Sequence, residues 1–567
     1  MNDMRRTLLW VVFSMSLFLI WDAWNKHNGQ PSLFSPAPAA KPVAGGAAPS
    51  ASAIPVPTTG VTAPTAVAAT APAAPASSAA STAEQVTITT DLVTATLDGK
   101  GGDLVRVEFL RHHDQADHGK NMVLLDQSAE RLYVAQSGLV PPNGGAGLPN
   151  HHTVMTRVAG DTRLKDGVNE LQVRFESPEV SGVKLVKTYT FKRADYVIGV
   201  KHEVVNVSTA PVSPRLYLQL VRDGNAPAGE SSFYFTFTGP AIYTDASKFT
   251  KIDFKNIEKR KPGDKPDHDT VADSGWVAMV QHYFASAWLI DPADGTKLAR
   301  EYFTGKVANN TYSVGMFVPV GEVAPGASKA FDAKLFVGPQ EEDKLAALAP
   351  GLELVKDYGW FTILAKPLFW LLTQLHKFIG NWGWAIVGLV VLLKIAFFWL
   401  NATAYRSMAK MKAINPKVMA MRERLKDKPQ EMQQEMMRIY REEKVNPLGG
   451  CLPIFVQMPF FIALYWVLLS SVEMRNAPWI GWIADLSAKD PYFILPLLMT
   501  GTSLFQTWLN PTPPDPVQAK MMWIMPLVFS IMFFVFPAGL VLYWLTNNIL
   551  SIAQQYLINK RLGVLGK

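Results

Sequence analysis

The strongest constraint on this 567-residue chain is a set of apolar segments after Glu353. As a helix, each segment would be about as long as a bilayer is thick. A helix needs about 20 mostly apolar residues to cross the hydrocarbon core of a membrane. Segments of this kind are 384–400, 452–469, 492–508, 521–536 and 538–557. Together with an apolar stretch from Leu8 to Trp24, they predict six transmembrane helices.

A further apolar stretch, Tyr358 to Ile379, is long enough to span but has a different pattern. Its polar residues follow one stripe at helical spacing: Thr362, Lys366, Thr373 and Lys377. A helix with one polar stripe lies more naturally in the membrane interface than across the core. If it spanned, the following loop with its eleven Lys and Arg residues would lie outside, whereas basic loops stay in the cytoplasm. We therefore predict an interfacial amphipathic helix over 353–380.

The N-terminal apolar stretch is expected to be an uncleaved signal anchor over residues 1–29. Arg5 and Arg6 precede it and hold the N-terminus in the cytoplasm. Bulky residues follow its apolar core, where a cleavage site would need small ones. Residues 30–83 are rich in Ala, Pro, Ser and Thr, which cannot bury enough apolar surface to order a chain, so we expect a disordered linker.

Residues 84–340 carry short runs that alternate apolar and polar side chains, as half-buried strands do. Examples are Lys184 to Phe191 and Arg215 to Leu220, and clusters of Gly, Pro, Asn and Asp separate the runs. This pattern predicts a large antiparallel β-sandwich, which lies outside the cytoplasm because it follows an anchor with its N-terminus inside. The expected fold class is mixed: a polytopic α-helical membrane protein with a β-sandwich domain.

The sequence lacks the motifs of common catalytic sites. No phosphate-binding loop, Gly-x-Ser-x-Gly turn or His-Glu-x-x-His helix occurs, so we expect no enzyme activity, no cofactor and no metal. The single cysteine, Cys451, cannot form an intrachain disulfide. Several histidines have no metal-site spacing and are expected to be solvated in loops: His112, His113, His118, His151 and His152. Although the chain is basic, its charges flank apolar segments, so no direct binding of nucleic acid is expected.

Lys394 stands in the middle third of a predicted span. A charge at that depth costs about 2.5–3.5 kcal/mol on insertion scales, which implies a use. One interpretation is a water-filled cavity, open to the cytoplasm, in which Lys394 meets acidic residues of a passing polypeptide. The alternative is that its long stem lets the ammonium reach the cytoplasmic interface.

Other polar residues in the predicted spans fit the same cavity or hold helices together. Gln457 lies in one span, and two further sets lie in others: Thr500, Thr502, Ser503 and Gln506, and then Tyr543, Asn547, Ser551 and Gln554. The second set follows one face of the last span, which favours a single polar face over scattered contacts.

The basic loop 402–446 has a helical pattern that breaks at Asp427-Lys428-Pro429, so it predicts a cytoplasmic helical hairpin. Arg422 and Arg424 contribute to its charge, and methionines recur along it: Met408, Met411, Met419, Met421, Met432, Met436 and Met437. Flexible thioether side chains suit varied apolar partners, so the hairpin could receive nascent segments. Alternatively, the methionines pack the two helices together.

Several motifs closely resemble the YidC insertases of Gram-negative bacteria, which are relatives of the mitochondrial oxidase-assembly and chloroplast Albino proteins. They are Asn381-Trp382-Gly383, Ser407-Met408-Ala409-Lys410-Met411, Asn446-Pro447-Leu448-Gly449-Gly450-Cys451, Gln457-Met458-Pro459 and Gly539-Leu540-Val541-Leu542-Tyr543-Trp544. The match extends in order and spacing from about Glu353 to Leu557, and the layout upstream is similar too.

The resemblance implies a five-helix insertase core over 381–558 with a hydrophilic groove open to cytoplasm and lipid. In it, Lys394 takes the position of the groove's positive charge, which is usually Arg in this family. Helices that guide the substrate carry Met458, Pro459, Phe461, Tyr543 and Trp544. The polar residues Gln457 and Asn547 are expected to lie in the same groove. The chain ends in a short basic tail, 559–567, which weakens the case for strong ribosome binding.

The implied function is insertion, folding and assembly of inner-membrane proteins, alone or with the Sec translocon. The implied partners are nascent membrane proteins, the translocon and the lipid bilayer, with the ribosome and signal recognition machinery as open candidates. The expected protein is multi-pass in the bacterial inner membrane, with both termini cytoplasmic and the large domain periplasmic. Alternatives are a translocon-dependent assembly chaperone, a secondary transporter and an anchored periplasmic carbohydrate-modifying enzyme.

Overall fold

The computed structural model describes residues 84–115, 117, 119–142, 147–227, 236–290, 297–425, 428–443, 452–510 and 516–561. The predicted anchor, linker and most of the basic tail lie outside these residues, as do His118 and Cys451. The described residues divide into two compact units, with the division in the chain between Lys356 and Asp357.

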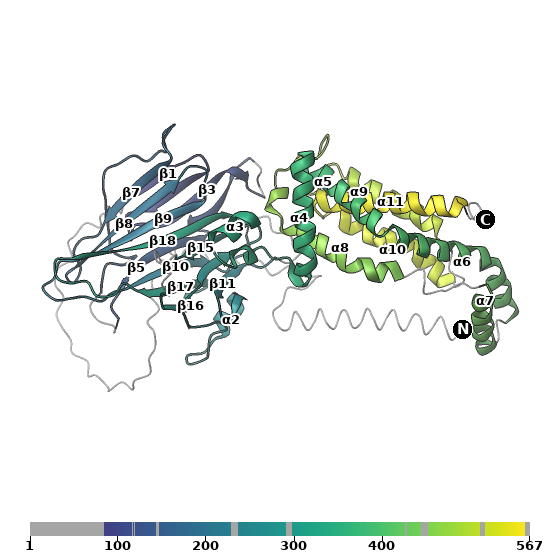
Figure 1. The fold of residues 1–567 in the computed structure, drawn as a ribbon, viewed down its shortest axis with the longest axis horizontal. Coiled ribbons are helices and arrows are strands. Elements are labelled where there is room, and N and C mark those ends of the chain that lie inside the picture. The colour runs from purple at the N-terminus through teal and green to yellow at the C-terminus, as the bar shows by residue number, and fades with distance from the viewer. Residues whose placement is uncertain are drawn as a thin grey trace. The chain divides into compact units, whose positions relative to one another are not determined.

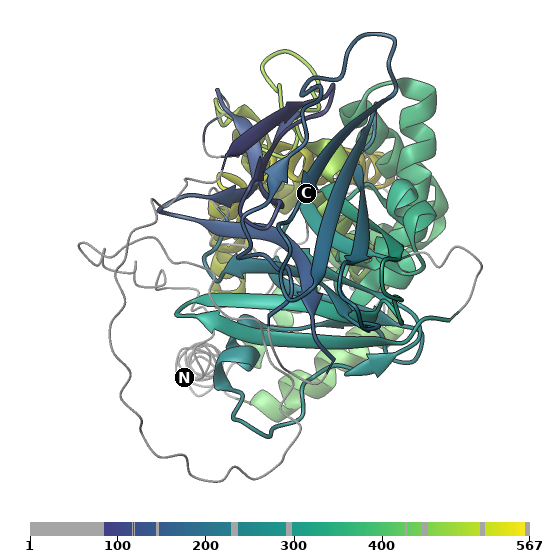
Figure 2. The same ribbon diagram turned by 90° about the vertical axis from the view of Figure 1, so that its left-hand side faces the viewer.

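The first unit contains two antiparallel sheets of nine strands each, drawn in Figures 1 and 2. In order across the first sheet are β1 (Gln85–Thr89), β2 (Val93–Asp98), β3 (Asp103–His113), β4 (Asn121–Gln127), β5 (Leu132–Val140), β10 (Arg215–Asp223), β17 (Thr311–Pro319), β16 (Arg300–Ala308) and β13 (Val271–Ala272). The second contains β12 (Lys248–Lys251), β11 (Gly239–Thr244), β14 (Trp276–Val280), β15 (Phe284–Leu289), β18 (Ser328–Pro339), β9 (Val197–Asn206), β8 (Val183–Lys192), β7 (Glu170–Glu176) and β6 (Thr156–Arg157). Two short helices accompany them, α2 (Phe254–Lys259) and α3 (Glu342–Leu348).

The predicted antiparallel β-sandwich is therefore confirmed. In β7, every second side chain is buried, as the alternation of apolar and polar residues requires. The central strand β10 pairs with β5 at one edge and β17 at the other, and its side chains from Leu216 to Asp223 are all buried. The large ring of Trp288 on β15 is buried and donates from Nε1 to the carbonyl oxygen of Gln219 on β10, at 3.0 Å.

A buried ion pair lies inside the β-sandwich. Lys187 on β8 donates to Oδ1 of Asp103 on β3 at 3.0 Å, and also to the carbonyl oxygens of Gly101 and Ser137, at 2.6 and 2.8 Å. Burial raises the pKa of Asp103 to about 6, against the opposing charge of Lys187. Burial also lowers the pKa of Lys187. Three oxygen acceptors around one ammonium offset part of the cost of desolvating it.

The histidine prediction is wrong for several positions. His151 is buried, and its backbone N–H donates to Oη of Tyr217 at 2.9 Å, so it is a structural residue. His112 and His113 belong to strand β3, and the ring centroid of His112 lies 5.4 Å from that of Phe284. The clusters of polar sequence around them had suggested loops, whereas packing against the second sheet extends the strand.

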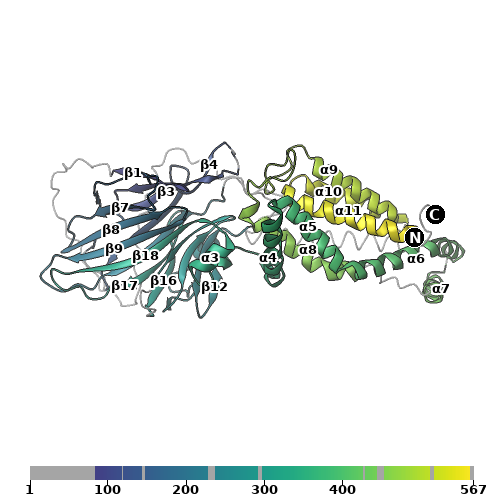
Figure 3. The same cartoon turned by 45° about the horizontal axis from the view of Figure 1, so that its top comes forward.

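The second unit is helical (Figures 1 and 3). Its helices are α4 (Thr362–Ile379), α5 (Trp382–Ala396), α6 (Phe398–Arg424), α7 (Pro429–Glu442), α8 (Leu452–Ser470), α9 (Ile494–Leu509), α10 (Pro516–Phe533) and α11 (Ala538–Arg561). Three short 3-10 turns are also present, at Leu352–Val355 in the first unit and at Gly359–Phe361 and Val472–Met474 in the second. Figure 3 shows α9, α10 and α11 side by side, and α9 packs against both of the others.

Length and hydropathy do not identify a single straight spanning helix among the described residues. One bent pair, α5 with α6, passes the same criteria together, with an angle of 68° between its two halves. The bend lies at Phe397, between the end of α5 and the start of α6.

The sequence around Asn381 explains how α5 starts. The side-chain oxygen of Asn381 accepts a hydrogen bond from the backbone N–H of Trp384, which caps the helix, and its amide donates to the carbonyl oxygen of Pro478. A side chain at Gly383 would collide with the ring of Trp479, so this position requires glycine. The Asn-Trp-Gly motif therefore joins the first turn of α5 to the segment between α8 and α9.

Helix α4 buries one apolar face against α5 and α8, through Ala365, Leu368, Phe369 and Leu372. Its other side exposes large apolar residues, with Ile363 at 87% and Phe378 at 92% of their full surface. Apolar side chains so exposed indicate a surface that meets another apolar phase.

Candidate functional site

A pocket beside Lys394 lies between α5, α8 and α11. Its volume of about 20 Å³ is enough to hold one water molecule. The residues that line it are Val390, Leu393, Lys394, Phe397, Gln457, Phe460, Phe461, Tyr543 and Asn547. Five of the eight residues expected in the groove thus meet at one place, although they come from three separate helices.

The ammonium group of Lys394 is held by the last helix. Its Nζ donates to Oγ of Ser551 on α11 at 2.7 Å, and Ser551 donates to the carbonyl oxygen of Asn547 at 2.7 Å. Tyr405 on α6 also has a hydrogen bond with Ser551. Ser551 therefore connects three helices at the cation.

Lys394 also lines a second, larger cavity of about 320 Å³ between α5, α6 and α11. Gln554 lines this cavity and donates from Nε2 to the carbonyl oxygen of Phe398 at 3.1 Å. That oxygen belongs to the first turn after the bend, so the last helix supports the bent backbone. The other lining residues are mainly apolar: Val391, Ile395, Phe398, Leu550, Leu557 and Ile558, together with Arg561.

Gln457 connects the pocket to the start of α6. Its Nε2 donates to Oδ1 of Asn401 at 2.7 Å, and Asn401 is buried. Asn401 and Tyr405 were not predicted from the sequence, because both fall just beyond the predicted span, in what looked like the basic loop. Their spacing of four residues, which puts them on one helical face, is the signal that could have found them.

Polar residues on α9 do not join this pocket. The amide of Asn548 on α11 donates to Oγ1 of Thr502 at 3.0 Å and to Oγ of Ser503 at 3.3 Å. Nearer the C-terminus, Gln555 donates to Oδ1 of Asn510 at 2.9 Å. For these residues the structure favours the alternative of helix–helix contact. Helix α11 therefore has two polar faces, one toward Lys394 and one toward α9.

The remaining expected groove residues lie around the pocket. The ring of Phe461 is 5.6 Å from that of Tyr543, centroid to centroid, and both rings belong to the pocket wall. Trp544 packs instead on Phe533 and Phe536, at centroid distances of 5.0 and 5.6 Å. Met458 is exposed and Pro459 is partly buried within α8, and neither lines the pocket.

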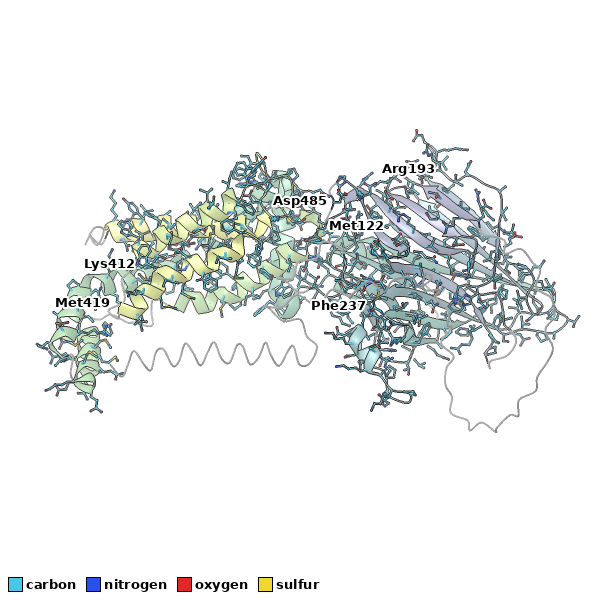
Figure 4. The ribbon with its side chains drawn as sticks, turned by 180° about the vertical axis from the view of Figure 1, so that it is seen from behind. Met122, Arg193, Phe237, Lys412, Met419 and Asp485 are labelled. Carbon is cyan, nitrogen blue, oxygen red and sulfur yellow. The ribbon has the colours of Figure 1, made fainter. Side chains whose placement is uncertain are left out.

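Helices α6 and α7 pack against each other and carry the expected hairpin residues. Ion pairs link the two helices, with 2.5 Å between Lys417 Nζ and Glu443 Oε1 and 3.8 Å between Arg424 and Glu435. Figure 4 labels Lys412 and Met419 along α6. The methionines divide between the two interpretations: Met421 is buried, Met419 and Met437 are exposed, and four are partly buried, namely Met408, Met411, Met432 and Met436. Arg422 is also partly buried and Arg424 is exposed.

Among the residues that the structure describes, no group of three or more His, Cys, Asp or Glu side chains is placed to hold a metal ion. The polar groups around Lys394 are hydroxyls and amides, which can bind water and peptide groups by hydrogen bonds. The chemistry that this arrangement supports is therefore polar recognition inside an apolar helix bundle.

Comparison with known proteins gives the family. Residues 85–371 match the family model described as the YidC periplasmic domain, and residues 374–563 match the one described as 60Kd inner membrane protein. The membrane protein insertase YidC of Cupriavidus taiwanensis is 55% identical over 99% of this chain and 98% of its own length. The protein of the same name from Janthinobacterium sp. is 52% identical over 99% of this chain and 100% of its own length.

A crystal structure described as an active YidC insertase with its first transmembrane domain resolved matches 84% of this chain and 94% of that chain, at 18% identity and a TM-score of 0.38. The matches to both family models and to full-length relatives agree with the motifs read along the sequence. The chain belongs to the YidC family of membrane protein insertases.

Proposed function

We propose that this protein inserts nascent membrane proteins into the bacterial inner membrane and helps them to fold and assemble. The observation that carries the proposal is the position of Lys394, a residue that lines two cavities and whose ammonium donates to Ser551 within the helix bundle. A cation kept inside apolar helices is costly and marks a functional site.

The proposed mechanism needs no covalent chemistry. A polar tail that enters the cavities exchanges part of its hydration for hydroxyl, amide and ammonium groups of the protein. The apolar distance that the tail must cross unaided becomes shorter, so the free-energy barrier to translocation falls. The client's own apolar segment then leaves toward the lipid because hydrocarbon is its favoured surroundings.

The proposed topology places both termini in the cytoplasm and the β-sandwich in the periplasm. Helix α4 would lie in the membrane interface, which accounts for its exposed apolar side chains such as Ile363 and Phe378. The hairpin of α6 and α7 would then project into the cytoplasm, where it receives client segments. The Sec translocon is the proposed partner for larger clients, with the ribosome and signal recognition machinery as further candidates.

The test is insertion of a short single-span client into liposomes that contain only this purified protein and no nucleotide. Protease protection of the translocated tail measures insertion, and empty liposomes are the control. Protection above the control supports autonomous insertion. Background protection with folded protein would contradict it and favour a translocon-dependent assembly chaperone. Ion or solute flux through the same liposomes would instead favour a transporter.

A further inference from the structure

Asn401, in the first turn of α6, has an unusual hydrogen-bonding state. Its side chain is buried, with 4% of its surface exposed. Its Oδ1 accepts from Nε2 of Gln457 at 2.7 Å, which fixes the orientation of the amide. Its Nδ2 is buried, and none of the described residues accepts a hydrogen bond from it.

A buried donor without an acceptor costs about 1–3 kcal/mol, so folded proteins rarely keep one without a reason. Asn548 on α11 offers a comparison within the same unit, because its exposed fraction is 6%. Its Nδ2 has two acceptors, Thr502 and Ser503. The helical unit therefore can satisfy a buried asparagine amide, and Asn401 differs from that pattern.

The position of Asn401 connects its unpaired donor to the groove. Gln457, its hydrogen-bonding partner, lines the pocket beside Lys394, and so does Phe397, one turn earlier in the chain. Tyr405, one turn later on α6, has a hydrogen bond with Ser551, the residue that holds Lys394. The first two turns of α6 thus lie between the pocket and the rest of the hairpin helix.

We infer that Asn401 is a client-binding residue, whose Nδ2 donates a hydrogen bond to a backbone carbonyl oxygen of the polar tail as it passes from the hairpin into the groove. Every residue of an extended tail carries such an acceptor, so this contact is independent of client sequence. The hydrogen bond from Gln457 occupies the amide oxygen of Asn401 and leaves its nitrogen without an acceptor among the described residues. The inference rests on the proposed insertion function. It adds a contact that a client with a long polar tail makes and a client with a minimal tail does not.

The functional experiment uses two clients with the same apolar segment, one with a long uncharged polar tail and one with a minimal tail. The full-length protein and the variants Asn401→Asp, Asn401→Leu and Asn548→Leu are compared in liposomes. Aspartate keeps the shape and the acceptor for Gln457 but removes the donor. Both Asn401 variants should lower insertion of the long-tailed client several-fold more than insertion of the short-tailed client. Asn548→Leu should change both clients by the same factor.

A second experiment measures contact without relying on activity. Asn401→Cys in a Cys451→Ser background is paired with a client that has a single cysteine in its long tail. With an added thiol oxidant that accepts the two electrons, a disulfide should form from position 401 during insertion, and the matched Asn548→Cys protein should form none.

Equal effects of the Asn401 variants on both clients, or no cross-link from position 401, would overturn the inference while insertion by the unsubstituted protein continues. If the unsubstituted protein inserts neither client, the proposed function fails and this inference fails with it.

Discussion

The ammonium nitrogen of Lys394 on α5 donates a 2.7 Å hydrogen bond to the hydroxyl of Ser551 on α11, 157 positions later in the chain. Ser551 passes its own hydrogen to the carbonyl oxygen of Asn547, so its oxygen can accept from the lysine. The contact provides a polar partner for a cation between apolar residues. Lys394 itself lines both cavities.

Replacement of Lys394 tests the role of its charge. We expect Lys394→Ala to lower insertion of a client with an acidic tail about tenfold, because a hydrogen bond to a charged group is worth about 1.5–3 kcal/mol. Lys394→Arg keeps the charge and should retain most of the activity. Protease protection of acidic and neutral tails measures the difference, and equal activity of all three proteins would rule out the role of charge.

Ser551 is expected to act through Lys394. Ser551→Ala removes the hydrogen-bonding partner of the ammonium and should lower insertion of the acidic-tailed client less than Lys394→Ala does. The double variant should be no worse than Lys394→Ala alone, because residues that act through one contact are not additive. Insertion rates of the four proteins form a double-mutant cycle. Additive losses would show that the two residues contribute separately.

The exposed methionines of the hairpin are expected to contact clients. Met419 and Met437 have exposed fractions of 52% and 50%, so the double substitution to Ser should weaken client capture without destabilising the fold. Met421 is buried, and Met421→Ala should instead lower the stability of the hairpin by about 2–5 kcal/mol. Client cross-linking and hydrogen exchange of α6 separate the two effects. Unchanged capture by the double variant would favour the packing interpretation for every methionine.

The buried ion pair in the β-sandwich predicts a large loss of stability when it is broken. Lys187→Met leaves the Asp103 carboxyl buried without its cation, and the expected cost is about 3–5 kcal/mol. Adding Asp103→Leu should restore much of the stability, since two apolar residues then replace two charges. Denaturant-dependent proteolysis of the β-sandwich measures the change. A single variant as stable as the unsubstituted protein would contradict this account.

His202 predicts how the stability of the β-sandwich responds to acid. Burial, reinforced by the charge of Lys187, lowers the pKa of His202 from its usual 6.5 to about 3. The unfolded chain therefore binds the extra proton between these values, and this group's contribution to stability is lost as pH falls from about 6.5 toward 3. Asp103, whose pKa is raised from 3.8 to about 6, has the opposite effect on stability. Between these pH values the folded chain binds the extra proton, so the contribution of Asp103 to stability falls as the pH rises.

Substitution isolates the histidine contribution. His202→Asn removes it, so the stability difference between the unsubstituted protein and the variant should shrink steadily as pH falls from 6.5. Hydrogen exchange of strands β8 and β9 at a series of pH values measures this difference. A stability difference that stays constant with pH would show that the pKa of His202 is the same in the folded and unfolded protein.

Much of the architecture followed from local pattern. Alternation along Lys184 to Phe191 predicted a strand, and it lies within β8 (Val183–Lys192). The break at Pro429 predicted a second hairpin helix, which starts at that residue as α7. Such features depend on backbone periodicity and on the missing N–H of proline, both of which are properties of the nearby sequence.

The candidate site was only partly visible in the sequence. The depth of Lys394 and the polar face of α11 pointed to a wet interior, because a charge in a long apolar run is improbable without a use. Helical spacing put Asn547 on one face with Tyr543 and Ser551, and Asn547 does line the pocket. No local pattern predicted the contact of the next residue, Asn548, with α9. Adjacent residues on a helix point in directions about 100° apart, so only the neighbouring helices give each one its role.

The sequence by itself determined the class of the protein, the order of its elements and the identity of its family, since these follow from periodicity, hydropathy and short motifs. Tertiary structure decided which groups meet: Lys187 with Asp103, Lys394 with Ser551, and Gln457 with Asn401. Each pair joins residues far apart in the chain. Their contact depends on how whole strands and helices pack to bury apolar surface, which no local pattern specifies.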